Sequence, residues 1–206
     1  KTGIIDKFRK GDGICEDYFN IFSSEFSNNT ILIPTFNYDF SRTRVMDIES
    51  TPSQVGALGN YVIKNSPYLR THTPMFSFGI KPGSDQFTIE ASDNPFGKSS
   101  TFAEITNKGG YLFFSGMKFS ECNTYSHYIE EQLNIGYRYI KRFQGSIISN
   151  KQSKSISFDF RVRPLCDIVS YDWERLEREA FDQKILYEFK LGNSTAHIIK
   201  ISDLIS

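Results

Sequence analysis

Apolar residues recur with a helical period over residues 12–26 and then give way to a short, continuous apolar run at residues 30–36. The first pattern predicts a helix with one buried stripe. The second predicts a buried strand that stops at Pro34, because proline cannot donate to a central ladder. Residues 37–49 show no period and are predicted to form a loop. Residues 51–54 read Thr-Pro-Ser-Gln, a capping pattern that predicts a helix start.

A second apolar run, Tyr-Leu-Phe-Phe at residues 111–114, follows a pair of glycines and predicts a strand that is covered on both faces. Asn123 and Thr124 are good N-caps for a helix after this strand. Beyond it, the pattern predicts a hairpin with one solvated face, a charged amphipathic helix and a last strand, over residues 137–162, 171–184 and 196–201. Because strands and helices are interspersed, we predict α/β layers in a single domain over residues 1–206.

The composition is that of a soluble globular protein, with 39% hydrophobic and 23% charged residues in a chain of 206. The 24 basic and 24 acidic residues give a formal net charge of zero. This balance argues against a nucleic-acid platform, which relies on neutralising phosphates, and against a polybasic membrane binder. No apolar stretch approaches the ~20 residues that a membrane span needs. We therefore expect neither nucleic acid nor a membrane as a partner.

Metal-binding and disulfide patterns do not emerge from the sequence. The three cysteines are widely separated and odd in number, so reduced thiols in the cytoplasm are expected. His72, His127 and His197 also lie far apart, and the chain has no His-Glu-x-x-His motif. No metal site is therefore predicted.

One pair of residues is a candidate for catalysis. His127 and Glu130 lie three residues apart in the predicted helix, a spacing that puts them on one face and within contact. A neutral imidazole accepts protons near physiological pH, and a carboxylate on its other nitrogen fixes the tautomer and the ring orientation. The pair follows the C-terminal end of a predicted strand, where open α/β sheets place their ligand crevice. A solvated helix face with an ordinary polar pair would have the same spacing.

Four segments share their motifs and their order with a known family. Residues 30–36 end in Pro-Thr-Phe, and residues 51–59 read Thr-Pro-Ser-Gln-Val-Gly-Ala-Leu-Gly. Residues 69–77 contain Arg-Thr-His-Thr-Pro, and Asn-Pro-Phe-Gly at residues 94–97 precedes the glycine pair, strand and His-x-x-Glu of residues 109–130. Together they resemble the aminoglycoside 3-N-acetyltransferase family, the YokD-like antibiotic acetyltransferases.

This resemblance implies a layered α/β/α fold with a mixed central sheet, plus a C-terminal β-hairpin and helix. It also implies acetyl transfer from acetyl-CoA to an amine by direct attack, without an acyl-enzyme. His127 matches the family's catalytic histidine, which takes the proton of the amine, and Glu130 matches the carboxylate that holds the ring and stabilises the imidazolium. By position, the residues implied to contact the coenzyme are Thr35, Phe36, Arg70, Thr71 and Ser77.

The chain departs from the family pattern at both ends. The family's first strand, with paired serines that help to hold the coenzyme, should precede Lys1, and the chain ends earlier than family members usually do. The domain is therefore expected to lack an N-terminal strand and a C-terminal extension. The histidine of the family's Arg-Ser-x-His-Pro element corresponds to Thr73, with His72 one place early, so His72 is assigned no role.

The acceptor implied by the resemblance is an amino group of an aminoglycoside or of an amino sugar. A polycationic antibiotic would call for an acidic cleft. A nucleotide-linked amino sugar of surface polysaccharide synthesis is the alternative, because the predicted hairpin carries the basic residues Lys141, Arg142, Arg161 and Arg163. A non-catalytic binding relative of the fold is a further alternative, and a homodimer is left open.

Overall fold

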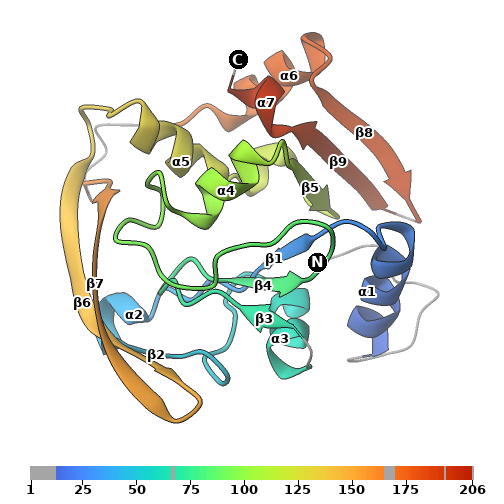
Figure 1. The fold of residues 1–206 in the computed structure, drawn as a ribbon. Coiled ribbons are helices and arrows are strands. Elements are labelled where there is room, and N and C mark those ends of the chain that lie inside the picture. Colours follow the sequence, from blue (N-terminus) through green and yellow to red (C-terminus); the bar gives the residue numbers. More distant parts are fainter. Residues whose placement is uncertain (1–12, 66–67, 165–169, 193, 206) are drawn as a thin grey trace. The chain divides into compact units, whose positions relative to one another are not determined.

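The computed structural model (Figure 1) describes residues 13–65, 68–164, 170–192 and 194–205. These residues form two compact units. The first unit lies within Phe8–Thr101 and Ile140–Phe160, and the second lies within Phe102–Tyr139 and Arg161–Ser206. His127 and Glu130 belong to the second unit, whereas the five residues predicted to contact the coenzyme belong to the first.

An antiparallel sheet of three short strands, in the order β1-β4-β3, forms part of the first unit. Its strands are β1 (Ile31–Pro34), β3 (Leu69–Arg70) and β4 (Phe78–Lys81). β1 ends at its proline, as predicted. The predicted first helix is confirmed as α1 (Gly13–Glu25), and its Phe19 forms a buried cluster with Ile33 and Val62. The apolar stripe of the helix is therefore used to cover this sheet.

The helix predicted after Thr51 begins later than the capping pattern indicates, since α3 spans Ala57–Lys64. The Thr51 hydroxyl accepts a hydrogen bond from the main-chain amide of Asp47 at 2.9 Å. The main-chain amide of Gln54, which a capping Thr51 would bind, donates instead to the Phe36 carbonyl at 2.8 Å. Because these groups are bonded to neighbouring segments, they do not cap a helix. The predicted helix start is therefore wrong by about one and a half turns.

Two glycines shape the observed start of α3. Gly56, the residue before the helix, has a φ of 138°, a conformation that side chains with a Cβ rarely adopt. Gly59 lies so close to β1 that a Cβ there would be 2.7 Å from the Pro34 carbonyl oxygen. The glycines thus allow the helix to pack directly on the strand backbone.

Residues 37–49, predicted to be a loop, contain a helical turn and a strand, α2 (Phe40–Thr43) and β2 (Val45–Asp47). β2 pairs in parallel with β6 (Tyr139–Ser149), which also pairs with β7 (Gln152–Val162) in the order β2-β6-β7. The long hairpin of β6 and β7 is prominent in Figure 1. A strand of three residues is too short for its hydrophobic pattern to be recognised in the sequence. β2 is a strand because it pairs with β6, which lies far along the chain.

The predicted hairpin with one solvated face is confirmed. Phe143 of β6 stacks against Phe158 and Phe160 of β7, with ring centroids 5.5 and 5.1 Å apart, and all three are buried. The intervening residues of both strands are largely exposed. The alternation of phenylalanine and polar residues therefore gives the period of two that a half-buried sheet requires.

The second unit contains an antiparallel sheet in the order β5-β9-β8, with short helices around it. Its elements are α4 (Thr101–Asn107), β5 (Tyr111–Ser115), the 3-10 turn η1 (Phe119–Glu121), α5 (Tyr125–Gln132), α6 (Trp173–Asp182), β8 (Leu186–Leu191), β9 (Ser194–Lys200) and α7 (Ile201–Leu204). The amphipathic helix and the last strand are confirmed as α6 and β9, whereas β8 was not predicted.

The expectation that residues 111–114 are covered on both faces is wrong. Leu112 and Phe114 pack against a buried cluster that includes Ile199 of β9, but Tyr111 is 59% exposed. Among the described strands β5 pairs only with β9, and so it lies at one side of the sheet that they form. A continuous apolar run does not by itself show whether a strand is covered on one face or on two.

The α/β fold class is confirmed, with helices interspersed among strands and both parallel and antiparallel pairing. Among the described residues the strands form three separate three-stranded sheets. None of the helices described here is long and apolar enough to span a membrane.

Candidate active site

α5 brings His127 and Glu130 together as their spacing predicts. The Nδ1 atom of His127 lies 3.1 Å from Oε2 of Glu130. The histidine side chain is 33% exposed and the glutamate side chain 10% exposed. Thr124 precedes the helix but makes no side-chain capping bond, so the cap expected there does not form. The contact between imidazole and carboxylate is a consequence of helical geometry alone.

Four side chains surround the Glu130 carboxylate. Tyr137 and Tyr171 both donate hydroxyl hydrogen bonds to Oε1, the second at 2.8 Å. Oε2 faces Arg138 in an ion pair of 2.6 Å and also faces His127. Both oxygens are therefore bonded, which fixes the plane of the carboxylate against the imidazole.

Glu130 is held in its ionised form. Burial would raise the pKa of this carboxyl, but hydrogen bonds from His127, Tyr137 and Tyr171 and the charge of Arg138 outweigh burial and lower the pKa to about 2. Burial and the hydrogen bond to Glu130 raise the pKa of Tyr137, so its hydroxyl remains a donor at neutral pH. The pair therefore presents an imidazole next to a permanent negative charge.

Arg138 contacts Oε2 of Glu130, the oxygen that does not accept the tyrosine hydrogen bonds. Its side chain is 7% exposed. Nη1 donates to the Arg161 carbonyl at 3.1 Å, and Nη2 donates to the Tyr171 hydroxyl at 3.0 Å. Nη2 also lies 2.9 Å from Nδ1 of His127. The guanidinium thus contacts both members of the candidate pair.

Sequence reasoning did not identify Tyr137, Arg138 or Tyr171 as parts of the site. The Tyr-Arg dipeptide follows Glu130 by seven and eight residues and opens the run that is predicted to form a strand with a solvated face. A basic residue next to an aromatic one, soon after a candidate carboxylate, is the signal that could have pointed to them. Tyr171 is 41 residues from Glu130, and no local pattern connects the two.

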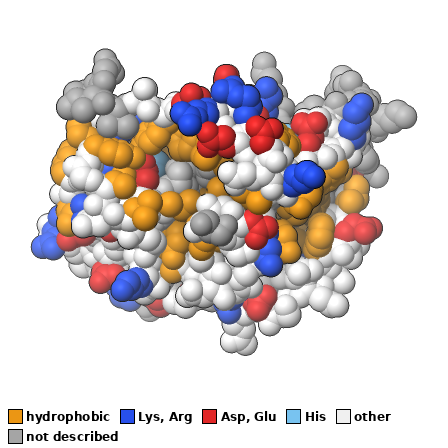
Figure 2. Space-filling view, turned by 90° about the horizontal axis from the view of Figure 1, so that it is seen from above, with side chains coloured by type: hydrophobic (Ala, Val, Ile, Leu, Met, Phe, Trp, Pro, Cys, Tyr) orange, Lys and Arg blue, Asp and Glu red, His pale blue; other side chains and the backbone are white. Residues whose placement is uncertain are grey.

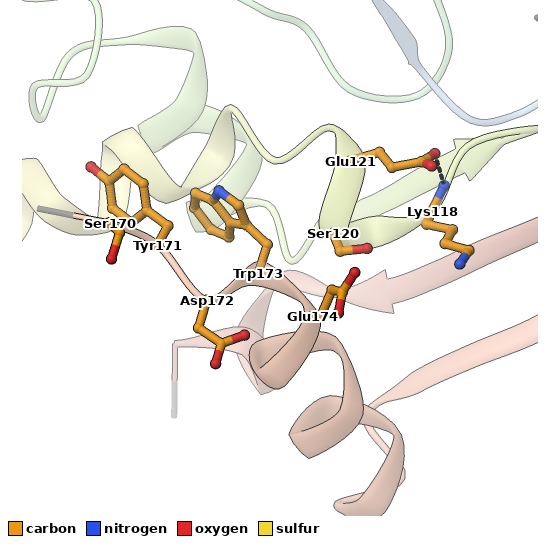
Figure 3. A pocket seen from close by; sticks show the side chains of 8 residues that line it. All are labelled: Lys118, Ser120, Glu121, Ser170, Tyr171, Asp172, Trp173 and Glu174. Carbon is orange, nitrogen blue, oxygen red and sulfur yellow. Dashed lines mark hydrogen bonds between the residues drawn. The ribbon is translucent and has the colours of Figure 1, made fainter. Parts of the chain in front are cut away.

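An open hollow of about 630 Å³ lies beside this cluster (Figure 3). It is lined by Lys118, Ser120, Glu121, Ser170, Tyr171, Asp172, Trp173 and Glu174. The rings of Tyr171 and Trp173 are stacked, with centroids 4.8 Å apart. Three carboxylates and one ammonium group give the hollow a negative excess, which suits a cationic ligand. Because Tyr171 also bonds Glu130, one residue contributes to both the hollow and the candidate pair.

The residues predicted to contact the coenzyme form a buried polar cluster in the first unit. Arg70 is at its centre, and its Nε donates to the hydroxyls of Thr35 at 3.2 Å and Ser77 at 3.1 Å. Thr71 accepts a hydrogen bond from a strand amide at 2.9 Å, and the ring of Phe36 packs edge-on against two other buried phenylalanines. The side chains of Thr35, Arg70 and Ser77 are bonded to one another, whereas those of Phe36 and Thr71 contact Phe76 and Phe78 of the same unit.

Arg70 also binds three main-chain carbonyls. Nη1 donates to Ile48 at 3.0 Å and to Thr51 at 2.7 Å, and Nη2 donates to Thr35 at 2.9 Å. Burial lowers the pKa of Arg70 to about 10, so the guanidinium stays charged at neutral pH. A charged group with this number of acceptors is well suited to hold several loops of the first unit in place.

A family profile identifies the chain. The profile of the family described as aminoglycoside 3-N-acetyltransferase matches residues 25–206. The chain belongs to this family. Among curated proteins, none matches the sequence.

Solved structures of the family share the fold of this chain. The YokD protein from Bacillus subtilis is similar with a TM-score of 0.72 and 14% identity, over 100% of this chain and 86% of that one. AAC-IIIb, in a binary structure with CoASH, has a TM-score of 0.68 and 14% identity, over 85% of this chain and 74% of its own. A mutant of AAC(3)-IVa in complex with apramycin has a TM-score of 0.71 and 16% identity, over 94% and 75% of the two chains. At these identities the likeness concerns the fold.

Each histidine of this family member has its own glutamate. Nδ1 of His72 lies 3.5 Å from Glu90, and Nε2 of His197 lies 2.9 Å from Glu188. His197 is buried, and its Nδ1 accepts a hydrogen bond from the Phe119 amide, so both of its ring nitrogens are bonded. The part of the chain described by the structure contains no group of three or more metal-binding side chains. The tyrosine and arginine contacts described above distinguish the pair on α5 from the other two pairs.

Proposed function

We propose that this chain transfers an acetyl group from acetyl-CoA to an amino group by direct attack, with His127 as general base and Glu130 as its partner. The observation that carries the proposal is the 3.1 Å contact between Nδ1 of His127 and Oε2 of Glu130, in a chain that belongs to an acetyltransferase family. The ring is partly exposed and the carboxylate is ionised, as a general base and its partner require.

The chemistry follows from these two groups. The amine nitrogen attacks the thioester carbonyl carbon, and a ring nitrogen of His127 takes the proton that the nitrogen loses. The C–N bond forms, the C–S bond breaks, and the departing thiolate is protonated in turn. Glu130 stabilises the imidazolium during the attack, because opposite charges in a partly buried site interact strongly.

Acetyl-CoA is the proposed acetyl donor, and the CoASH-bound AAC-IIIb structure supports a coenzyme of this kind. Thr35, Phe36, Arg70, Thr71 and Ser77 remain predicted coenzyme contacts. Because their side chains are buried, we propose that they act by holding the backbone that the coenzyme meets. A reaction that uses acetyl-CoA is expected in the cytoplasm.

The proposed acceptor is an amino group of an aminoglycoside or amino sugar. The apramycin complex of AAC(3)-IVa supports the first class. The acidic hollow beside Tyr171 would favour a polycationic acceptor. On the face shown in Figure 2, basic and acidic side chains are interspersed rather than gathered by sign.

Two of the four hairpin cations offer less support for an anionic, nucleotide-linked acceptor than the sequence pattern suggests. Arg142 pairs with Asp159 at 2.7 Å, and Arg161 lies 3.8 Å from Glu131. These cations already have acidic neighbours, so their charge is partly neutralised within the protein. The aminoglycoside acceptor is therefore the first to be tested.

Thiol release from acetyl-CoA by the whole chain tests the proposal. The amines are apramycin, free hexosamines and nucleotide-linked amino sugars, each at several concentrations. We expect thiol release with at least one amine, and we expect it to be lost in His127→Ala and retained in His72→Ala. Absence of turnover with every amine, together with no heat of coenzyme binding in calorimetry, would instead support a non-catalytic binding relative.

A further inference from the structure

Arg138 is a cation in direct contact with the candidate base. Its Nη2 lies 2.9 Å from Nδ1 of His127 and 2.6 Å from Oε2 of Glu130. We propose that Arg138 is a positioning residue that keeps His127 neutral, by opposing the effect of Glu130 on the ring. This inference rests on the proposed function, in which His127 must be free to accept a proton.

At Nδ1 of His127, Arg138 and Glu130 favour opposite protonation states of the ring. A guanidinium is a donor at every accessible pH, whereas an ionised carboxylate only accepts. A neutral ring can satisfy either neighbour, because Nδ1 can carry a hydrogen toward Glu130 or accept one from Arg138. An imidazolium carries hydrogens on both nitrogens and must direct the Nδ1 hydrogen into the space that Nη2 also occupies. Arg138 therefore opposes the charged ring both by its charge and by its hydrogens.

Arg138 cannot easily turn away from the ring. Its side chain is almost fully buried, and its two terminal nitrogens bond the Arg161 carbonyl and the Tyr171 hydroxyl. The Tyr171 hydroxyl is in turn fixed by its hydrogen bond to Glu130. The guanidinium is thus attached to three segments of the second unit, and its distance to Nδ1 is a property of the fold.

In the part of the chain that the structure describes, several charged and titratable groups lie around the ring, and Arg163 lies over the Tyr171 ring, 5.6 Å from its centroid. Glu130 comes from α5, Arg138 and Tyr137 from the start of the hairpin, and Tyr171 from the segment before α6. Beyond them, Arg161 lies 3.8 Å from Glu131, so that pair adds little net charge. At Nδ1 a negative and a positive group therefore lie within 3.1 Å, and removal of either shifts the balance toward the other.

The consequence concerns catalysis near neutral pH. A histidine paired only with a buried carboxylate tends to retain its proton, and a protonated ring cannot act as a base. With Arg138 beside it, Glu130 can fix the ring orientation without holding the ring in its charged form. The pair then remains available for proton transfer.

The experiment is an NMR titration of the His127 ring in the whole chain without substrates, alongside the pH profile of kcat/KM. In Arg138→Met the midpoint of the ring titration is expected to rise by about one pH unit or more, because the unopposed carboxylate favours the charged ring. The acid limb of kcat/KM should move to higher pH by the same amount.

Two further variants serve as controls. Arg138→Lys keeps the charge and should restore most of the wild-type midpoint. Arg142→Met is the matched control, since that side chain is 66% exposed and pairs with Asp159, and it should leave the midpoint unchanged.

An unchanged or lowered midpoint in Arg138→Met would overturn the proposal. If that variant does not fold, Glu130→Gln tests the same charge balance by removing the negative group at Nδ1 instead of the positive one. The ring then faces Arg138 without a carboxylate, so its midpoint should fall, and a constant or raised midpoint would overturn the inference. The titration needs no turnover. A shifted midpoint in a protein without acetyltransferase activity would reject the proposed function alone, whereas acetyl transfer with an unshifted midpoint would reject this inference alone.

Discussion

The Tyr171 hydroxyl donates a hydrogen bond of 2.8 Å to Oε1 of Glu130, across 41 residues of the chain. The same hydroxyl accepts from Arg138 at 3.0 Å, and the Tyr171 ring stacks on Trp173 in the wall of the acidic hollow. One side chain thus joins the candidate acceptor hollow to the candidate catalytic pair. A ligand in the hollow would contact a residue that also orients the carboxylate.

Tyr171→Phe should lower kcat more than it raises KM. The substitution removes one donor to Glu130 and one acceptor for Arg138, and a lost hydrogen bond to a charged group costs about 1.5–3 kcal/mol, or roughly 10- to 150-fold in kcat. Steady-state kinetics with acetyl-CoA and a responsive amine measure the effect. Tyr187→Phe is the control, because that ring is 58% exposed on β8. Equal kinetics for the two variants would contradict the orienting role.

Glu130→Gln should make the free energy of unfolding less dependent on pH in the acid range. The pKa of Glu130 is lowered from 4.5 to about 2 in the folded chain. A carboxylate whose folded pKa is depressed stabilises the fold above its unfolded pKa, and this contribution disappears as pH falls from about 4.5 toward about 2. Between about pH 6 and about pH 3, wild type should therefore lose about 1 kcal/mol more unfolding free energy than the variant, after allowance for solvent screening.

Urea unfolding of both proteins at the two pH values measures this difference. Carboxylates other than Glu130 contribute equally to both proteins and cancel in the comparison. Equal losses in the wild type and in Glu130→Gln would mean that the four contacts do not depress the pKa of this carboxyl.

Arg70→Met should destabilise the first unit severely. The substitution removes all hydrogen bonds from the guanidinium and leaves the buried carbonyls of Thr35, Ile48 and Thr51 without those donors. We expect the free energy of unfolding to fall by about 3 kcal/mol or more. Denaturant unfolding followed by circular dichroism measures it, with the exposed Arg142→Met as a control that should change by less than about 0.5 kcal/mol. A small effect at Arg70 would show that this cluster does not hold the loops.

Gly59→Ala should be destabilising although alanine is the better helix former. The new Cβ would lie 2.7 Å from the Pro34 carbonyl oxygen, so α3 would have to move away from β1, at a cost of about 1–3 kcal/mol. Gly136→Ala is the matched control, because a Cβ there has nothing within 4 Å. Thermal unfolding of both variants measures the difference, and a lower melting temperature in Gly136→Ala than in Gly59→Ala would contradict the packing argument.

Several elements could be predicted because their signals are local. The period of α1, the alternation of β7 and the amphipathic pattern of α6 are all contained within a few turns or residues. Predictions were wrong where a distant segment competed for the same groups. Thr51 has the sequence pattern of an N-cap, but its hydroxyl accepts a hydrogen bond from the Asp47 amide. The apolar run at β5 predicts cover on both faces, but Tyr111 is exposed.

The sequence by itself determined that this is an α/β chain with the motifs of its family, and that His127 meets Glu130, because residues three apart on a helix share a face. Only the tertiary structure decided what surrounds that pair. Tyr137, Arg138 and Tyr171 reach the carboxylate from a turn and from a segment far along the chain, and such contacts depend on how loops close rather than on any local period. The charge balance at the imidazole is therefore a property of the fold, since it is set by distances between groups that the sequence separates.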